Sequence, residues 1–171
     1  MGQIIGTIMI LGGIAGVLQQ WIQLQRERQK RLEEFEKFLH KSIFAMETEN
    51  VKIIDYFAKY SSKDSQITQV LHEIAKRLSQ NIYPKGQLVW EEVFREEEQN
   101  WKLDRETFEL LIKMGNGFFG RSREENLSFL RKQLEELEKQ KKTIKEKDEK
   151  ERKVWIPVSM LSGIMLTILF L

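Results

Sequence analysis

Two histidines, His40 and His72, are the only side chains in the sequence that offer an imidazole to a metal or to acid–base chemistry. His72 is followed by Glu73, as in the first half of a zinc-protease helix motif, but Lys76 stands where the second histidine is required. The sequence has no cysteine, which excludes thiolate zinc sites, disulfides and thiol catalysis. We therefore interpret His72 as a surface residue and predict no metal and no other cofactor.

The glycines from Gly115 to Gly120 are the one cluster that suggests a phosphate-binding loop. They lack the Gly-Lys-Ser/Thr ending that holds phosphate and magnesium, so we interpret them as a turn between helices in which glycine adopts positive φ. The acidic groups Glu91–Glu92 and Glu96–Glu98 could form an acid–base pair or a docking patch for a basic partner, but a solvated helix face is the favoured interpretation. No catalytic constellation results, and the chain is not expected to be an enzyme.

Charge is distributed unevenly along the 171 residues. All 28 basic and 26 acidic residues lie between Arg26 and Lys153, so the first 25 residues and the last 18 carry none. The net charge of +2 gives no reason to expect nucleic-acid binding. The sequence thus combines a polar central part, of the size of one domain, with an uncharged and largely apolar segment at each end.

Both uncharged ends are predicted to be transmembrane helices, at residues 2–24 and 154–171. Eighteen helical residues span about 27 Å, close to the ~30 Å hydrocarbon core of a bilayer. A signal peptide is the alternative for the first segment, but the positive charges follow its apolar run instead of preceding it. A buried core helix is the alternative for the second, although such a helix would lie at the extreme terminus without a polar face.

Basic residues beside the two segments predict their orientation. They occur at 26–31, after the first segment, and at 150–153, before the second. Because basic residues concentrate on the cytoplasmic side of a membrane, we expect the central part in the cytoplasm and both termini outside. Trp21 and Trp155 lie at the same two boundaries, where amphipathic rings are favoured.

Small residues recur at helical spacing in both segments. Gly6, Gly13 and Gly16 share a face of the first, and Ser159 and Gly163 form a small-xxx-small pair in the second. Small residues let helices approach closely in lipid. Either the two helices pair within one chain or they contact other membrane proteins; glycines with no packing role are the alternative.

The central part, residues 25–144, is predicted to be an all-α antiparallel helical bundle. Glycine and proline are sparse there, and apolar residues recur at steps of three and four. The first expected helix continues the N-terminal segment. The expected apolar stripes lie at 32–46, 51–60, 67–78 and 88–94, and at 108–112 in a helix that Asp104 caps.

The last helix is predicted to be the longest. Ser122 followed by Glu125 has the spacing of a capping box. Residues 145–153 are all charged, so we expect a helical stalk surrounded by solvent that leads into the second segment; a flexible tether is the alternative. Upstream, a leucine stripe follows the 3.5-residue period of a coiled coil, with Lys141 at the position that breaks it: Leu127, Leu130, Leu134, Leu137 and Ile144.

Four patterns, in their order and spacing, resemble the stage III sporulation protein AB family of endospore-forming bacteria over essentially the whole chain. They are Met46-Glu47-Thr48-Glu49, Trp90-Glu91, the turn from Met114-Gly115 to Gly120, and Leu161-Ser162-Gly163. The glycines of the family's turn stand closer together than those here. The family also favours glutamine where this chain has Asn126.

The resemblance implies a membrane platform or scaffold subunit of the secretion-like channel complex between mother cell and forespore. It implies a location in the mother-cell (outer forespore) membrane, with the membrane, other channel proteins and a cytoplasmic ATPase as partners and no nucleic acid. The family's helical body is similar to type II secretion F proteins, which contact such an ATPase; this is an analogy of fold. A generic membrane-anchored coiled-coil regulator or sensor is the alternative.

The same resemblance marks six candidate residues for a contact surface or for the packing that supports one. Trp90 as an ordinary core residue is the alternative, and the carboxylates are the more telling members because glutamate is rarely buried unless paired. The six residues are Glu47, Glu49, Trp90, Gly115, Gly120 and Asn126.

Overall fold

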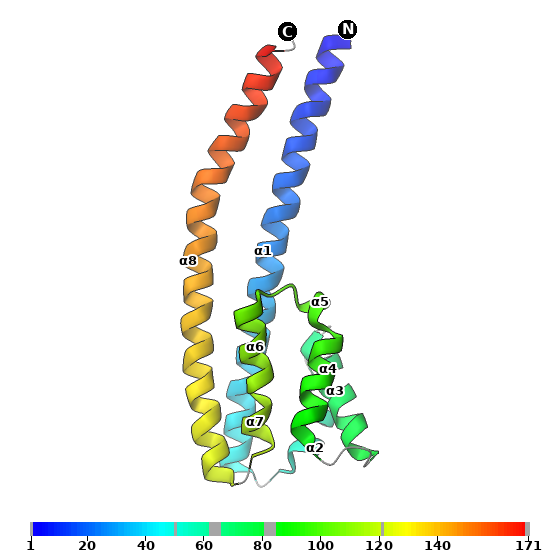
Figure 1. The fold of residues 1–171 in the computed structure, drawn as a ribbon, viewed down its shortest axis with the longest axis vertical. Coiled ribbons are helices and arrows are strands. Elements are labelled where there is room, and N and C mark those ends of the chain that lie inside the picture. The colour runs from blue at the N-terminus through cyan, green and yellow to red at the C-terminus, as the bar shows by residue number, and fades with distance from the viewer. Residues whose placement is uncertain (1, 50, 62–65, 81–84, 121, 170–171) are drawn as a thin grey trace. The chain divides into compact units, whose positions relative to one another are not determined.

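A computed structural model describes residues 2–49, 51–61, 66–80, 85–120 and 122–169 (Figure 1). These residues form helices and no strand, so the all-α prediction is confirmed. The helices are α1 (Gly2–Thr48), α2 (Ile53–Lys59), α3 (Gln66–Ser79), α4 (Gly86–Glu96), α5 (Glu98–Trp101), α6 (Arg105–Lys113), α7 (Gly115–Phe118) and α8 (Arg123–Leu169). The segments between the predicted stripes 51–60, 67–78 and 88–94 fall partly outside the described residues.

The chain divides into two compact units. The terminal unit contains residues 1–27 and 142–171, and the body contains residues 28–141. Helices α1 and α8 contribute residues to both units. Each unit combines segments that lie far apart in the sequence. The structure of each unit therefore depends on tertiary contact between α1 and α8.

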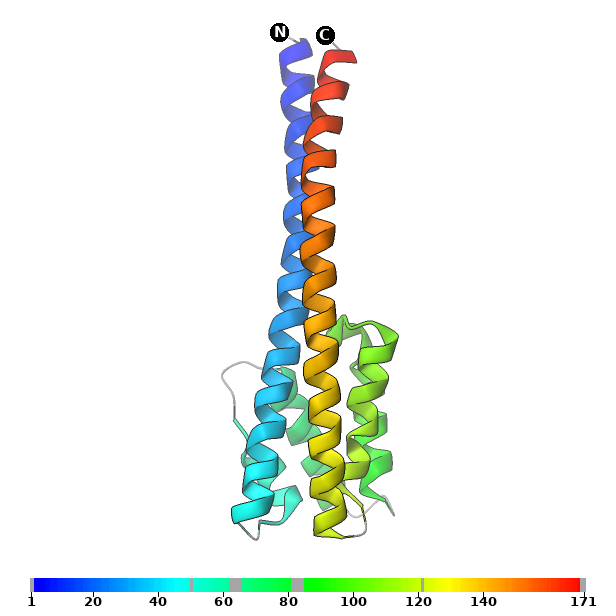
Figure 2. The ribbon, with the colours of Figure 1, turned by 90° about the vertical axis from the view of Figure 1, so that its left-hand side faces the viewer.

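In the terminal unit, the first half of α1 and the last half of α8 run side by side in opposite directions (Figure 2). Arg152 Nε donates to Gln25 Oε1 at 2.8 Å. Asp148 is only 2% exposed, and Arg152 is half-buried. The prediction that the charged stretch 145–153 is surrounded by solvent is therefore wrong at these two positions, because α8 turns one side of the stretch inward. Its prediction as helix is correct.

Among the residues that the structure describes, no helix is long and apolar enough to cross a membrane. The transmembrane helices predicted at 2–24 and 154–171 are therefore unsupported by the described residues and stay a prediction. Residues 170 and 171, the end of the second segment, lie outside those residues.

The body is built on the apolar stripes that the sequence predicts. Helix α2 packs on α3, α3 on α4, and α4 on α6 and α7. The stripes of α1, α3, α4, α6 and α8 are buried at most of their positions, including Leu32, Leu71, Val93, Leu111 and Leu130. Asp104 caps α6, as predicted, by accepting a hydrogen bond from the Thr107 amide at 3.0 Å.

Aromatic rings occupy the centre of the body. Trp90 is fully buried and stacks on Phe94 with ring centroids 4.6 Å apart, and Phe94 stacks on Trp101 at 5.4 Å. Phe35 of α1 meets all three rings edge-on. The Trp90 indole Nε1–H donates to the Leu111 carbonyl at 3.1 Å, which satisfies its one polar group. The cluster therefore joins α1, α4, α5 and α6 around one indole.

Helix α5 is an element that the sequence analysis missed. It follows α4 after Glu97 and ends at Lys102, which has φ 51° and ψ 34°. Lys102 is the single described residue other than glycine with positive φ. This left-handed residue ends α5 without the glycine that usually marks such a position, so the sequence carried no signal for the turn.

A fragment of residues 28–141 should fold into a helical domain without the terminal unit, because the aromatic cluster lies entirely within it. In this fragment Trp90→Ala should lower the free energy of unfolding by ~3–5 kcal/mol, since it removes the buried indole. Leu88→Ala, at a half-exposed position of the same helix, should cost well under 1 kcal/mol. Urea unfolding followed by circular dichroism measures both. Equal losses for the two variants would contradict the central role of Trp90.

Candidate interaction site

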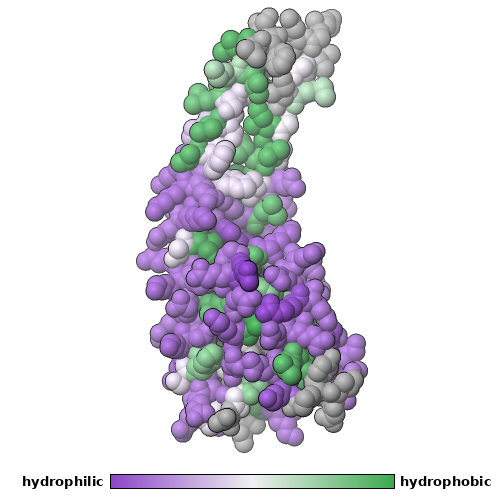
Figure 3. Space-filling model, viewed as in Figure 1, coloured by the Kyte–Doolittle hydropathy of each residue, from purple (hydrophilic) through white to green (hydrophobic). Residues whose placement is uncertain are grey.

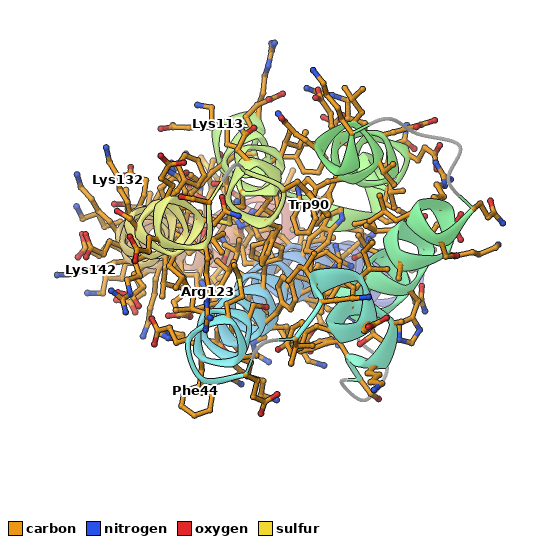
Figure 4. All side chains as sticks on the ribbon, turned by 90° about the horizontal axis from the view of Figure 1, so that it is seen from below. Phe44, Trp90, Lys113, Arg123, Lys132 and Lys142 are labelled. Carbon is orange, nitrogen blue, oxygen red and sulfur yellow. The ribbon has the colours of Figure 1, made fainter. Side chains whose placement is uncertain are left out.

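Trp90 and Gly115, two of the six candidates, contact each other inside the body. A Cβ atom built on Gly115 would lie 2.6 Å from Trp90 Cδ1 and 2.8 Å from its Cγ. Both residues are buried, and Trp90 points into the bundle (Figure 4). Glycine is required here because α7 approaches the face of α4 more closely than a side chain permits. This pair therefore belongs to the packing of the body.

Gly120 and Asn126 form a second contact pair. A Cβ atom on Gly120 would lie 2.0 Å from Asn126 Oδ1, and one on Gly117 would lie 2.6 Å from Leu130 Cδ2. No described glycine has positive φ. The prediction that the glycines of this segment adopt positive φ is therefore wrong. The segment does connect α6 to α8, but Gly115 and Gly117 are needed for close packing, whereas the atom nearest to Gly120 is the movable end of the Asn126 side chain.

Arg123, in the first turn of α8, binds the end of α1. Its Nε donates to the Met46 carbonyl at 2.7 Å and its Nη2 to the Glu47 carbonyl at 2.9 Å. The last carbonyls of a helix lack partners within it and carry partial negative charge. Arg123 therefore caps the C-terminus of α1, which has no basic residue in its own last turn. Figure 4 shows its side chain directed toward α1.

The Glu47 side chain is held at the same place by an ion pair with Arg131 of α8. We call this set, Arg123 and Arg131 with Met46 and Glu47, the α1–α8 junction. Sequence reasoning missed both arginines. A signal existed for Arg123, because a basic residue in the first turn of a helix opposes the helix dipole and so suggests another partner.

Glu49 lies beyond the junction and is exposed. Burial raises the pKa of the Tyr56 phenol, and the negative charge of Glu49 acts in the same direction, against a hydrogen bond with Ser42. Glu49 thus stands near α2. The junction brings Glu47 close to the start of α8, where Gly120 and Asn126 pack, whereas Trp90 and Gly115 lie in the core. The six candidates therefore form an exposed group and a buried pair.

Glu36, His40 and Glu138 form the one cluster of described residues with metal-ligand geometry. One ligand atom from each lies within 4.8 Å of the others. Glu36 already forms an ion pair with Lys141, and His40 Nε2 lies 3.5 Å from Glu138 Oε1. Because the Lys141 ammonium neutralises Glu36, we interpret the cluster as an ion-pair network that fixes α1 against α8. Lys141, the residue that breaks the leucine stripe, thereby acquires a partner.

His72 is exposed, as predicted, and it also joins two helices. Its Nε2 lies 2.9 Å from the Tyr60 carbonyl oxygen. A carbonyl only accepts, so Nε2 carries the proton and donates. The bond fixes α3 against the end of α2, which is a structural task.

The acidic residues of α4 pair mostly with two arginines of the body. Arg77 Nη2 lies 2.6 Å from Glu96, and its Nε lies 2.9 Å from Glu73. Arg95 binds Glu91 and Glu109 at 3.0 and 3.2 Å. The hydrogen bonds from Arg77 lower the pKa of both Glu73 and Glu96. This surface is therefore partly neutralised within the chain.

The glycines proposed for helix packing lie in the terminal unit. A Cβ atom on Gly6, Gly13 or Gly16 would meet no described atom within 4 Å. Gly163 of α8, by contrast, is buried. The glycine face of α1 is therefore open in this structure and does not support the pairing of α1 with α8.

Gly115→Ala should lower the free energy of unfolding by about 1–3 kcal/mol, because the new methyl group overlaps the Trp90 indole. Asn116→Ala, an exposed position of the same short helix, is the matched control and should change it by less than ~0.5 kcal/mol. Thermal and urea unfolding measure both. If the two variants are equally stable, the close approach at Gly115 is not a constraint.

Arg77→Gln should reduce the acid sensitivity of the fold. Glu73 and Glu96 have lowered pKa values in the folded state, so their contribution is present above about pH 4.5 and is lost as the pH falls through those lowered values. Both pairs lie at the surface, with the Glu73 and Glu96 side chains 37% and 51% exposed, so each contributes only ~0.2–1 kcal/mol. Unfolding at pH 6 and pH 3.5 should show a smaller drop for Arg77→Gln than for Lys113→Gln, whose lysine is exposed. Equal drops would contradict the role of Arg77.

Comparison with known proteins gives one finding. A family model described as stage III sporulation protein AB matches residues 3–171, nearly the whole chain. No curated protein and no solved structure matches this chain. The matched range includes both units and every candidate residue named above.

Proposed function

The chain belongs to the stage III sporulation protein AB family, and from this premise we propose that it is a membrane platform subunit of the channel complex between mother cell and forespore. A stage III sporulation role follows from the family itself. The scaffold role is supported by what the geometry provides: helix packing, ion pairs between helices and an exposed junction. We propose a scaffold that needs no cofactor, not an enzyme.

Membrane attachment is supported by the surface of the terminal unit. Most of the large apolar side chains exposed among the described residues belong to this unit, including Val17, Leu161 and Ile168 at 69%, 66% and 70% exposure. In Figure 3 apolar side chains gather on the described part of the terminal unit, whereas the surface of the body is mostly hydrophilic. A contiguous apolar surface of this kind marks a membrane or protein contact. We place the terminal unit in the mother-cell (outer forespore) membrane, with the body in the cytoplasm and both termini outside.

The α1–α8 junction is the observation that supports a docking role for the body. It fixes Glu47 and the end of α1 against α8, while leaving Glu49 exposed beside them. A fixed helix end with an exposed carboxylate is suited to contact with a basic surface. We propose that this end of the body contacts the cytoplasmic ATPase of the complex, and that the terminal unit contacts other channel proteins. A generic membrane-anchored regulator remains the competing function.

Glu47→Ala combined with Glu49→Ala should leave the body folded but block sporulation after engulfment, and the cytoplasmic ATPase should no longer be recovered with the variant. The reason is the loss of both carboxylates at the proposed contact. Spore counts and pull-downs from sporulating cells measure the two effects, and circular dichroism checks the fold.

Two variants separate the possible causes. Arg131→Ala breaks the ion pair of the junction but keeps both carboxylates, so it should sporulate. Glu135→Ala with Glu136→Ala removes two exposed charges elsewhere on α8 and should also sporulate. If Arg131→Ala reproduces the defect, the glutamates act through stability. If the Glu47 and Glu49 variant retains both sporulation and the ATPase, the docking proposal is wrong.

A further inference from the structure

The two helices of the terminal unit enclose a groove. It has a volume of about 620 Å³. Its walls are mostly apolar, with two serine hydroxyls on the α8 side. Residues that line it include Val17, Leu18 and Trp21 of α1 and Trp155, Val158 and Ser159 of α8.

Basic residues stand close in sequence to the two tryptophans of this groove: Arg26 comes five residues after Trp21, and Arg152 and Lys153 come three and two residues before Trp155. Arg26 and Lys153 are exposed, and Arg152 is half-buried. Gln25 Oε1 accepts a hydrogen bond from Arg152 Nε at 2.8 Å, and this bond fixes the guanidinium between α1 and α8. Trp21 lies one helical turn from Gln25, about 6 Å along α1, and Trp155 lies about 4.5 Å along α8 from Arg152. Each indole is therefore about one helical turn from the Arg152–Gln25 hydrogen bond.

The size of the groove favours a chain-like ligand over a third helix. Ligand sites typically measure about 300–1,000 Å³, which includes this groove. A helix with its side chains is about 10 Å wide, whereas an acyl chain is a single carbon chain. An acyl chain is narrow enough to lie between α1 and α8.

We propose that this groove binds an acyl chain of an anionic phospholipid, with the lipid phosphate against Arg152 and its basic neighbours. The inference rests on the proposed membrane location of the terminal unit. Arginine is suited to phosphate because its guanidinium donates in a fork geometry, and tryptophan rings favour the headgroup level. In this proposal the apolar walls bind the acyl chain, and the basic side chains bind the phosphate of the headgroup.

The test uses the full chain purified in a mild detergent and supplied with phosphatidylglycerol or phosphatidylcholine. Native mass spectrometry should show at least tenfold preferential retention of phosphatidylglycerol, and its addition should raise the melting temperature by several degrees. Arg152→Gln should abolish the preference between the two lipids, whereas Lys150→Gln, an exposed lysine in the charged stretch, should keep it. Ser159→Phe fills the groove and should lose retention of both lipids, whereas Met160→Phe, outside the lining, should not.

Three results would overturn the inference. They are equal retention of both lipids by the unaltered chain, undiminished retention by Ser159→Phe, and cross-linking of a second copy through a cysteine placed at Val158. The proposed function is tested separately by fractionating sporulating cells. A chain that enters membranes but shows no lipid preference removes only this inference, whereas a chain absent from membranes removes the membrane platform as well.

Discussion

The contact between Trp90 and Gly115 is the constraint on which the body depends. The fully buried indole needs a neighbour without a side chain at Gly115, and its ring stacks on Phe94. Its single polar group is satisfied by the Leu111 carbonyl, so α6 is fixed by the same residue. Four helices therefore take their positions around one ring system. Since buried aromatic side chains contribute much of a core's stability, a change at either residue is transmitted to the whole bundle.

Ion pairs between α1 and α8 then select how these two helices face each other within the body. Glu36 pairs with Lys141, and Glu47 with Arg131. Apolar stripes alone permit one helix to slide by a turn past the other, because leucine packs similarly at neighbouring positions. Charged pairs at both ends of the contact allow one alignment, even though each exposed pair adds little stability. Arg123 strengthens the alignment because it binds backbone carbonyls, whose position no side-chain rotation can change.

Helical periodicity accounts for what could be predicted from the sequence, and tertiary contact accounts for what could not. Most of the buried residues of α1, α3, α6 and α8 follow from steps of three and four, since burial on one helix face is a local pattern. The partner of Lys141 and the burial of Asp148 depend on which helix lies opposite, which no local pattern contains. Gly115 shows the same limit. The sequence analysis assigned this glycine to backbone conformation, whereas the structure shows a lack of space beside Trp90.

The division of the six candidate residues also bears on how such a protein can act. Trp90 and Gly115 pack against each other inside the body, so folding explains their identity without a partner. Glu47 and Glu49 are exposed, and only residues of this kind can report on an external contact. Glu47 is itself engaged by Arg131, which leaves Glu49 as the carboxylate whose presence the fold explains least. A partner that binds this end of the body would therefore contact the negative charge of Glu49, which the junction positions but does not neutralise.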